Sequence, residues 1–277
     1  MEILTQKYRI QQFSFIPSVF GYNKLDFKDS KEYINITSQK SFFIEIVKEI
    51  NKRKKPSKLV PVLVFFESRQ ILREFYDSEQ FQNIHNYGQI KILDESVSIQ
   101  DKDSIVKQAV QQGSVTLITK ELGRGTDFIC YDQSIDALGG VHVIQTFFSD
   151  ELSEEVQIKG RTARQSSTGS YSMVLLDSGL EKYKIDIKFV QFMHDSGKYY
   201  SEIDPRRRTY FDEQYPEMMK FVKVIMEDHK KAQDYLYHLQ KNEVTQAIQF
   251  LTEKNKCLLG DDFVSAYRAQ FRQGNVK

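Results

Sequence analysis

Residues 116–127 read TLITKELGRGTD, and residues 157–164 read QIKGRTAR. The first stretch is an apolar strand that runs directly into a glycine-bracketed turn. Because open parallel α/β sheets bind ligands beyond the carboxyl ends of their strands, we expect this turn to approach a ligand closely. The turn also offers a hydroxyl and a carboxylate. It therefore predicts a ligand-binding site made by Gly123, Arg124, Gly125, Thr126 and Asp127.

The second stretch has the spacing Q-x-x-G-R-x-x-R. On a helix, its four defining residues would fall three or four apart and share one face. A guanidinium group in such a place can stabilise charge on a transferring phosphoryl group. The alternative is a surface helix with solvated arginines. We predict that Arg161 and Arg164 are catalytic, and that Gln157 and Gly160 bind the same ligand.

Apolar runs of strand length alternate with helical periodicity. The run PVLVFF at 61–66 is continuous, which indicates a strand buried on both faces of a parallel sheet. The pattern predicts an α/β fold with an open, mostly parallel sheet flanked by helices. The expected strands are 33–36, 61–66, 90–93, 115–119, 140–146 and 171–176, and the expected helices are 37–54, 68–76, 101–112 and 149–163.

The chain is expected to divide into three parts. Residues 1–30 are irregular, residues 31–178 form the sheet domain, and residues 179–277 form an α-helical C-terminal region. In that last region, apolar residues over 212–241 step by three and four, which predicts a long amphipathic helix. Shorter helices are expected at 244–253 and 263–271, and Arg206-Arg207-Arg208 is expected to be solvated at a helix entry.

Composition narrows the class of protein. The 277 residues are 40% hydrophobic and 28% charged, with a net charge of +1, so no global field would recruit nucleic acid or an acidic membrane. The two cysteines lie far apart, which predicts reduced thiols and no metal site. No apolar run reaches the ~18 residues of a membrane span, and no signal peptide is recognisable at the N-terminus. We expect a cytoplasmic protein without a membrane span.

Over about residues 10–178, the chain resembles the second motor lobe of the SecA preprotein translocase ATPases. The segments PVLV (61–64), GRGTD (123–127) and QIKGRTARQ (157–165) are similar to helicase motifs IV, V and VI of that family. GGVHVI (139–144) resembles a strand that is rather particular to SecA, and Gly169-Ser170-Tyr171 fits the start of a later strand. The resemblance implies a RecA-like helicase C-terminal lobe. Asp127 would lie near the ribose or the interlobe hinge, and Arg161 and Arg164 would be γ-phosphate sensors or arginine fingers.

The chain also departs from the family's pattern. Residues 146–156 are acidic where the family is rich in arginine, and Lys159 replaces the first arginine of motif VI. Ala163 and Ser166 replace glycines. No G-x-x-x-x-G-K-[ST] loop occurs in the 277 residues, and ILDES (92–96) is expected to be a surface acidic turn and not a metal-binding motif. ATP with magnesium is therefore expected as a cofactor only if a first lobe completes the site, and the chain alone is not expected to hydrolyse ATP.

Three functions are compatible with these features. The leading hypothesis is a SecA-like motor lobe in protein translocation, whose partners are a first RecA-like lobe in trans or in a longer parent, and a polypeptide substrate or translocase. A second is the second lobe of an RNA or DNA helicase, although nucleic acid is the less expected partner. A third is a degenerate lobe that serves as an interaction scaffold, with the long helix binding a partner.

Overall fold

The computed structural model describes residues 11–14, 16, 19, 22–52, 54–55, 58–84, 89–123, 125–243 and 246. Arg124, Cys257 and nearly all of the two helices expected after residue 243 lie outside this set. The chain divides into two compact units, Met1–Phe211 and Asp212–Lys277. The domain ranges expected from the sequence stay a prediction.

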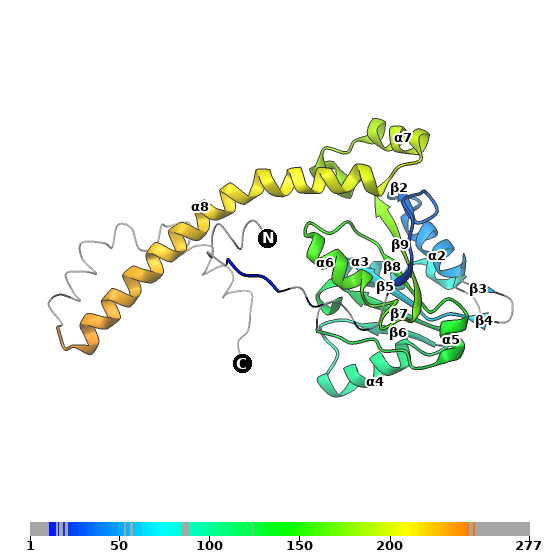
Figure 1. The fold of residues 1–277 in the computed structure, drawn as a ribbon, viewed down its shortest axis with the longest axis horizontal. Coiled ribbons are helices and arrows are strands. Elements are labelled where there is room, and N and C mark those ends of the chain that lie inside the picture. The colour runs from blue at the N-terminus through cyan, green and yellow to red at the C-terminus, as the bar shows by residue number, and fades with distance from the viewer. Residues whose placement is uncertain are drawn as a thin grey trace. The chain divides into compact units, whose positions relative to one another are not determined.

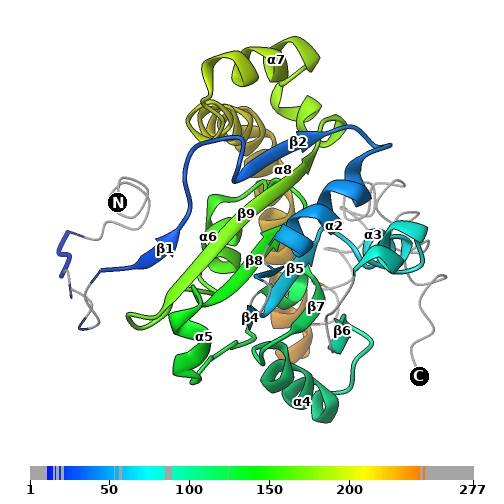
Figure 2. The ribbon, with the colours of Figure 1, turned by 90° about the vertical axis from the view of Figure 1, so that its right-hand side faces the viewer.

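The first unit is built on a seven-stranded sheet with the order β1-β9-β8-β5-β7-β6, in which β2 also pairs with β9. All of its strand pairs are parallel. Figure 2 shows β1 and β2 beside the long strand β9, where they act as two halves of a broken edge strand. The strands are β1 Lys24–Asp26, β2 Ile34–Thr37, β5 Val62–Phe66, β6 Gln89–Leu93, β7 Ser114–Thr119, β8 Val141–Gln145 and β9 Thr168–Leu176.

The central strand β5 is buried on both faces, as its continuous apolar run predicts. Val62, Val64 and Phe66 pack into one core, together with residues of α2 (Phe42–Lys52) and α3 (Arg69–Tyr76). Leu63 and Phe65 pack into the other core, with residues of α4 (Ile99–Ala109) and α6 (Leu152–Lys159). Helices therefore cover both faces of the sheet (Figure 1), and the expected α/β fold class is confirmed.

Short elements complete the first unit. A two-stranded antiparallel sheet joins β3 (Lys54–Lys55) to β4 (Lys58–Leu59), so α2 ends at Lys52 and not near residue 54 as expected. The remaining short elements are the 3₁₀ helices η1 Glu79–Asn83, η2 Lys120–Gly123 and η3 Ser178–Tyr183, and the helices α5 Gln133–Ala137 and α7 Ile187–Ser196.

Helices α6 and α8 are among those that differ from their expected bounds. Helix α6 ends at Lys159 and not near residue 163, with Gly160 as its C-cap. The backbone of the residues that follow cannot continue a right-handed helix, because Ala163, Gln165 and Ser166 have φ angles of 53°, 48° and 70°. The long helix α8 spans Tyr200–Gln240 and so begins before residue 212.

The earlier start of α8 explains why one arginine of the basic triplet is not solvated. Arg207 is only 2% exposed and forms ion pairs with Glu155 and Asp204. The expectation of a solvated triplet is therefore wrong for Arg207, while the Arg208 side chain is 70% exposed. None of the helices in the described part of the chain has the length and apolar character to cross a membrane.

Candidate functional site

The structure brings parts of residues 116–127 and 157–164 together at one pocket. This pocket has a volume of about 270 Å³ and is lined by Asp127, Arg161 and Arg164. Val141 and Thr168, the first residues of β8 and β9, also line it, so it borders the amino ends of these strands. The expectation that the pocket lies beyond the carboxyl ends of the strands is wrong. The reason is that α6 runs back from the carboxyl end of β8 toward the amino end of β9. Arg161 and Arg164 follow the last residue of α6 and therefore lie at the amino ends of the strands.

Arg161 is fastened to the backbone of the glycine turn. Its Nε donates a hydrogen bond of 2.8 Å to the carbonyl oxygen of Gly123, and its Nη2 donates to the same oxygen. Arg161 is 8% exposed. Gly123 itself lies under α6, where an added Cβ would stand 3.0 Å from Cγ1 of Ile158. The absence of a side chain at residue 123 thus lets the turn and α6 approach closely.

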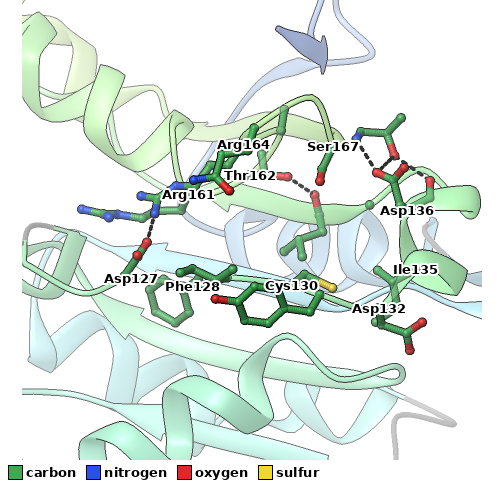
Figure 3. Close-up of a pocket in the computed structure, with 17 residues that line it drawn as sticks. Asp127, Phe128, Cys130, Asp132, Ile135, Asp136, Arg161, Thr162, Arg164 and Ser167 are labelled. Atoms are coloured by element: carbon green, nitrogen blue, oxygen red, sulfur yellow. Dashed lines mark hydrogen bonds and ion pairs between the residues drawn. The ribbon is translucent and has the colours of Figure 1, made fainter. Parts of the chain in front are cut away.

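Arg164 pairs with the carboxylate at the end of the turn. Its Nη1 forms an ion pair with Oδ1 of Asp127, and its Nε donates a 2.5 Å hydrogen bond to the carbonyl oxygen of Gly160. The side chains of Arg164 and Asp127 are 33% and 57% exposed. Figure 3 shows this pair at one end of the pocket, with Asp132 and Asp136 at the other. Burial lowers the pKa of both Arg161 and Arg164, but a guanidinium group stays protonated in proteins.

The arginine loop, residues 160–167, is tied to the sheet on its other side. Thr162 Oγ1 donates a 2.6 Å hydrogen bond to the carbonyl oxygen of Val141. A Cβ on Gly169 would stand 2.0 Å from Thr162 Oγ1, so this glycine allows β9 to pass directly beneath the loop. Positive φ angles at three non-glycine residues of the loop are a local strain that its surroundings must hold in place.

The other predicted site residues are less directly placed. Gln157 is exposed and does not line the pocket, because α6 ends before the four motif residues can share one helical face. Gly160 is the C-cap of α6, and Gly125 has a φ of 67°. Thr126 is 3% exposed, and its hydroxyl has no hydrogen-bond partner among the described residues. Arg124 lies outside the described residues.

Sequence reasoning missed the far end of the pocket. Cys130, Tyr131, Asp132 and Asp136 line it, and none of them belongs to a motif. Asp132 is the N-cap of α5, and Asp136 accepts a hydrogen bond of 2.9 Å from Thr168 Oγ1. Burial raises the pKa of the Cys130 thiol. The spacing of Asp132 before a short helix is a capping signal that could have placed α5.

A second pocket lies where the sequence predicted the first one. It has a volume of about 360 Å³ and is lined by residues that follow the carboxyl ends of β5, β7 and β8. Among the described residues that line it, Lys120 is the one basic residue, and Lys182 pairs with the lining residue Asp150 at 2.5 Å. The five acidic residues are Glu67, Glu121, Asp150, Glu151 and Glu154.

The acidic motif ILDES is structural. Asp94 is 2% exposed and forms ion pairs with Arg69 at 3.1 Å and Arg73 at 2.9 Å. The expectation of a surface turn is therefore wrong for Asp94. The carboxylate is buried because Arg69 and Arg73 of α3 form ion pairs with it. Within the described ranges, no group of three His, Cys, Asp or Glu residues is arranged to hold a metal ion.

Helix α6, which leads into the arginine loop, is held by a buried charged network. Glu155 is fully buried and pairs with Arg207 at 2.6 Å and Lys159 at 2.9 Å. The Lys159 ammonium lies over three aromatic rings, at 4.4 Å from the Phe27 centroid, 4.8 Å from Tyr200 and 5.0 Å from Tyr171. Lys159 therefore fills an aromatic enclosure and does not line the pocket of Arg161 and Arg164.

Comparison with known proteins identifies SecA proteins as relatives of part of the chain. SecA 3 of Magnetococcus marinus is 38% identical over 76 residues, which are 27% of this chain and 11% of that protein. SecA of Syntrophus aciditrophicus is 30% identical over 144 residues, 51% of this chain and 16% of that protein. SecA 2 of Bacillus thuringiensis subsp. konkukian is 26% identical over 161 residues, 56% of this chain and 19% of that protein.

The chain thus spans less than a fifth of the length of these curated relatives. No family model matches it. Among solved structures, domain 2 of the Mss116p DEAD-box helicase bound to an RNA duplex is 17% identical with a TM-score of 0.41, covering 56% of this chain and 59% of that chain. Because this TM-score is low, the fold class rests on the parallel sheet itself.

Proposed function

We propose that this chain is a motor lobe of a SecA-like ATPase and contributes arginines to a nucleotide held mainly by a phosphate-loop lobe. That first lobe would be on another chain or in a longer parent. The observation that carries the proposal is the pairing of Arg164 with Asp127 at an open pocket, next to the buried Arg161. The sequence similarity to SecA proteins supports protein translocation as the work that the motor performs.

The residues of the pocket fit a phosphate better than a whole nucleotide. Guanidinium groups recognise phosphate oxygens with directed hydrogen bonds, and partial burial strengthens those bonds. A volume of about 270 Å³ lies just below the usual range for ligand pockets, about 300–1,000 Å³, as expected for half of a shared site. ATP would supply the γ-phosphate on which charge develops, and the first lobe would hold the magnesium ion.

Each predicted site residue has a place in this proposal, with Arg161 next to Arg164 on the arginine loop and bonded to the Gly123 carbonyl. Arg164 would stabilise charge on the γ-phosphate, and Asp127 would lie beside the ribose or the interlobe hinge. Thr126 would present its hydroxyl nearby. The backbone of Gly123, Arg124 and Gly125 would approach the nucleotide. Gln157 and Gly160 would support the arginine loop.

The acidic second pocket favours a polypeptide over a nucleic acid as the moving partner. Nucleic-acid binding depends mainly on cations that neutralise phosphates. At the carboxyl ends of β5, β7 and β8, five carboxylates face Lys120, and a second lysine, Lys182, pairs with Asp150. An electrostatic surface of this sign repels a phosphate backbone and tolerates a polypeptide with basic residues.

One observation favours the scaffold alternative. On α8, large apolar side chains beyond residue 211 are about half exposed, among them Phe221 at 58%, Ile225 at 45% and Leu236 at 54%. An exposed apolar face of this kind is a common binding surface for a helix or groove. In this alternative, a partner binds α8 and ATP has no effect on the binding.

The test is reconstitution of ATP hydrolysis. The purified chain is assayed alone, together with the phosphate-loop lobe of a SecA protein, and that lobe is assayed alone. The proposal predicts no hydrolysis by the chain and a rate for the mixture at least tenfold above that of the first lobe. A mixture no faster than the first lobe by itself, despite measurable association, would leave the scaffold alternative in its place.

A further inference from the structure

The two arginines of the loop have different surroundings. Both Nε and Nη2 of Arg161 donate to one backbone oxygen, that of Gly123, and the residue is 8% exposed. Arg164 bonds a backbone oxygen only through Nε, and its Nη1 faces the side chain of Asp127. Arg161 thus holds the protein's own backbone, whereas Arg164 holds a side chain that can move away.

The Gly123 carbonyl depends on Arg161. If Arg161 turned toward a phosphate, it would leave its buried place and remove both of the hydrogen bonds that fix the end of the turn. That turn leads directly to Asp127. These contacts favour a role for Arg161 in positioning the turn, in which it would stay on Gly123 when a phosphate arrives.

The pair of Arg164 and Asp127 is weak enough to exchange. The Asp127 side chain is 57% exposed, and ion pairs at such positions are screened by water. A polyphosphate carries several negative charges and offers a guanidinium group two parallel hydrogen bonds. It would therefore compete successfully with a single carboxylate for Arg164.

From these contacts we infer that Asp127 is a competing counter-ion that occupies Arg164 until a phosphate displaces it, and that Arg161 is a positioning residue. This inference rests on the proposed function, because it assigns the phosphate contact of the motor lobe to one arginine. It predicts that removing the charge of Asp127 strengthens phosphate binding, although a role in orienting Arg164 would predict the opposite.

The test uses the full chain without a first lobe. Tripolyphosphate is titrated into the chain and its binding is followed by phosphorus NMR. Asp127→Asn should tighten binding three- to fivefold, the range expected when a half-exposed ion pair is removed. The matched control is Asp132→Asn, which removes the same charge from the far end of the same pocket and keeps an N-cap side chain. It should change the affinity less than twofold.

The arginines are compared in the same titration. Arg164→Lys should weaken tripolyphosphate binding at least fivefold, because lysine cannot form the two parallel hydrogen bonds. Arg161→Lys should weaken it less than Arg164→Lys does, because Arg161 contacts the backbone oxygen of Gly123 and not the phosphate.

Several results would overturn the inference. They are equal or weaker binding by Asp127→Asn, an effect of Asp132→Asn as large as that of Asp127→Asn, a greater loss from Arg161→Lys than from Arg164→Lys, and no binding by any variant. Because no first lobe is present, these results are independent of whether the reconstituted pair hydrolyses ATP. If the reconstituted pair hydrolyses ATP but Asp127→Asn does not change tripolyphosphate binding, the counter-ion role of Asp127 would be rejected and the proposed motor function retained.

Discussion

At the scale of single residues, the arginine loop explains what a glycine contributes to this motif. Ala163 and Ser166, which replace glycines of the SecA pattern, both have positive φ angles, as does Gln165 between them. A non-glycine residue in this conformation costs about 1–2 kcal/mol. The chain thus keeps the path of the loop that glycines would take without strain, and it does so at a cost in stability.

This strain predicts a stabilising substitution. Gln165 is exposed with a φ of 48°, so Gln165→Gly relieves the strain without removing buried surface. We expect the free energy of unfolding, measured with urea, to rise by about 0.5–1 kcal/mol. The matched control is Gln157→Gly, an exposed glutamine within α6, which should lower it by about 1 kcal/mol. Equal effects of both substitutions would contradict the account.

Asp94 predicts a pH dependence of stability. Burial raises its pKa, but hydrogen bonds from Ser96 and Arg73 and the charge of Arg69 outweigh burial and hold the pKa below its ordinary value. A lowered pKa in the folded state stabilises the protein above the unfolded pKa of about 3.9, and this contribution is lost as pH falls through the folded pKa.

Asp94→Asn should therefore lower the free energy of unfolding at pH 7 by about 1.5–3 kcal/mol, the usual contribution of hydrogen bonds to a charged group. The difference from the unmodified chain should shrink below about pH 4. Urea unfolding between pH 7 and pH 3 measures both. Asp195→Asn, at an exposed position, should change stability by less than about 0.5 kcal/mol at each pH. A difference for Asp94→Asn that persists unchanged at pH 3 would refute this interpretation.

The sequence predicted which residues line the pocket better than it predicted which atoms they contact. The glycine and arginine motifs indicated which residues gather, and Asp127, Arg161 and Arg164 do line one pocket. The partner of Arg161 was not predictable, because every residue has a backbone carbonyl group and the sequence does not indicate which one a side chain will contact. The burial of Asp94 was missed for a related reason: its partners, Arg69 and Arg73, are exposed helix residues whose pairing depends on tertiary structure.

At the scale of elements, α6 and the start of α8 form one electrostatic unit. Glu155 of α6 and Arg207 of α8 are both buried. Arg207 also pairs with Asp204, and the Tyr200 hydroxyl donates to Glu155, while Nε of Arg207 has no hydrogen-bond partner among the described residues. Burial opposes the charge of Arg207, but the charge of Glu155 and the hydrogen bonds that Arg207 donates to Asp204 and Glu155 raise its pKa above the ordinary value. This network positions the helix from which the arginine loop begins.

Breaking the network should be costly. Arg207→Met removes the buried ion pairs of Arg207 with Glu155 and Asp204 and leaves Lys159 as the ion-pair partner of Glu155, so the free energy of unfolding should fall by about 3–5 kcal/mol. Arg208→Met is the matched control, since the neighbouring arginine is 70% exposed and its pair with Asp204 contributes at most about 1 kcal/mol. Chemical denaturation of both variants decides the matter, and a loss below 1 kcal/mol for Arg207→Met would rule out a stabilising role for the network.

Helix boundaries show where local pattern stops being sufficient. The strands of the sheet were predictable because burial on both faces leaves continuous apolar runs, as in β5 and β7. The end of α6 was not, because Arg161–Arg164 has no helix-breaking residue and its loop is fixed by contacts with β8 and β9. The start of α8 was hidden by Pro205, which stands in the second turn of the helix and lacks the amide that would donate to the carbonyl of residue 201, so its sequence signal is that of a helix boundary.

At the scale of the whole molecule, the distribution of charge matters more than its sum. The net charge is +1, but the pocket at the carboxyl edge of the sheet is lined by five acidic residues and Lys120, with Lys182 paired to Asp150. We therefore expect no salt-sensitive binding of single-stranded RNA, measured by fluorescence anisotropy at 50 and 200 mM salt. Affinity that falls tenfold or more over this range would instead favour the helicase alternative.

The central claim is that Arg164 reaches a phosphate of a nucleotide held by another lobe. The most direct measurement is kcat for ATP hydrolysis by the chain reconstituted with a SecA phosphate-loop lobe, comparing Arg164→Ala with Arg208→Ala at saturating ATP. An arginine that stabilises charge on the transferring phosphoryl group accounts for about 10³–10⁵ in kcat. The account predicts a loss of at least about a hundredfold for Arg164→Ala and less than twofold for Arg208→Ala. An unchanged kcat for Arg164→Ala would contradict it.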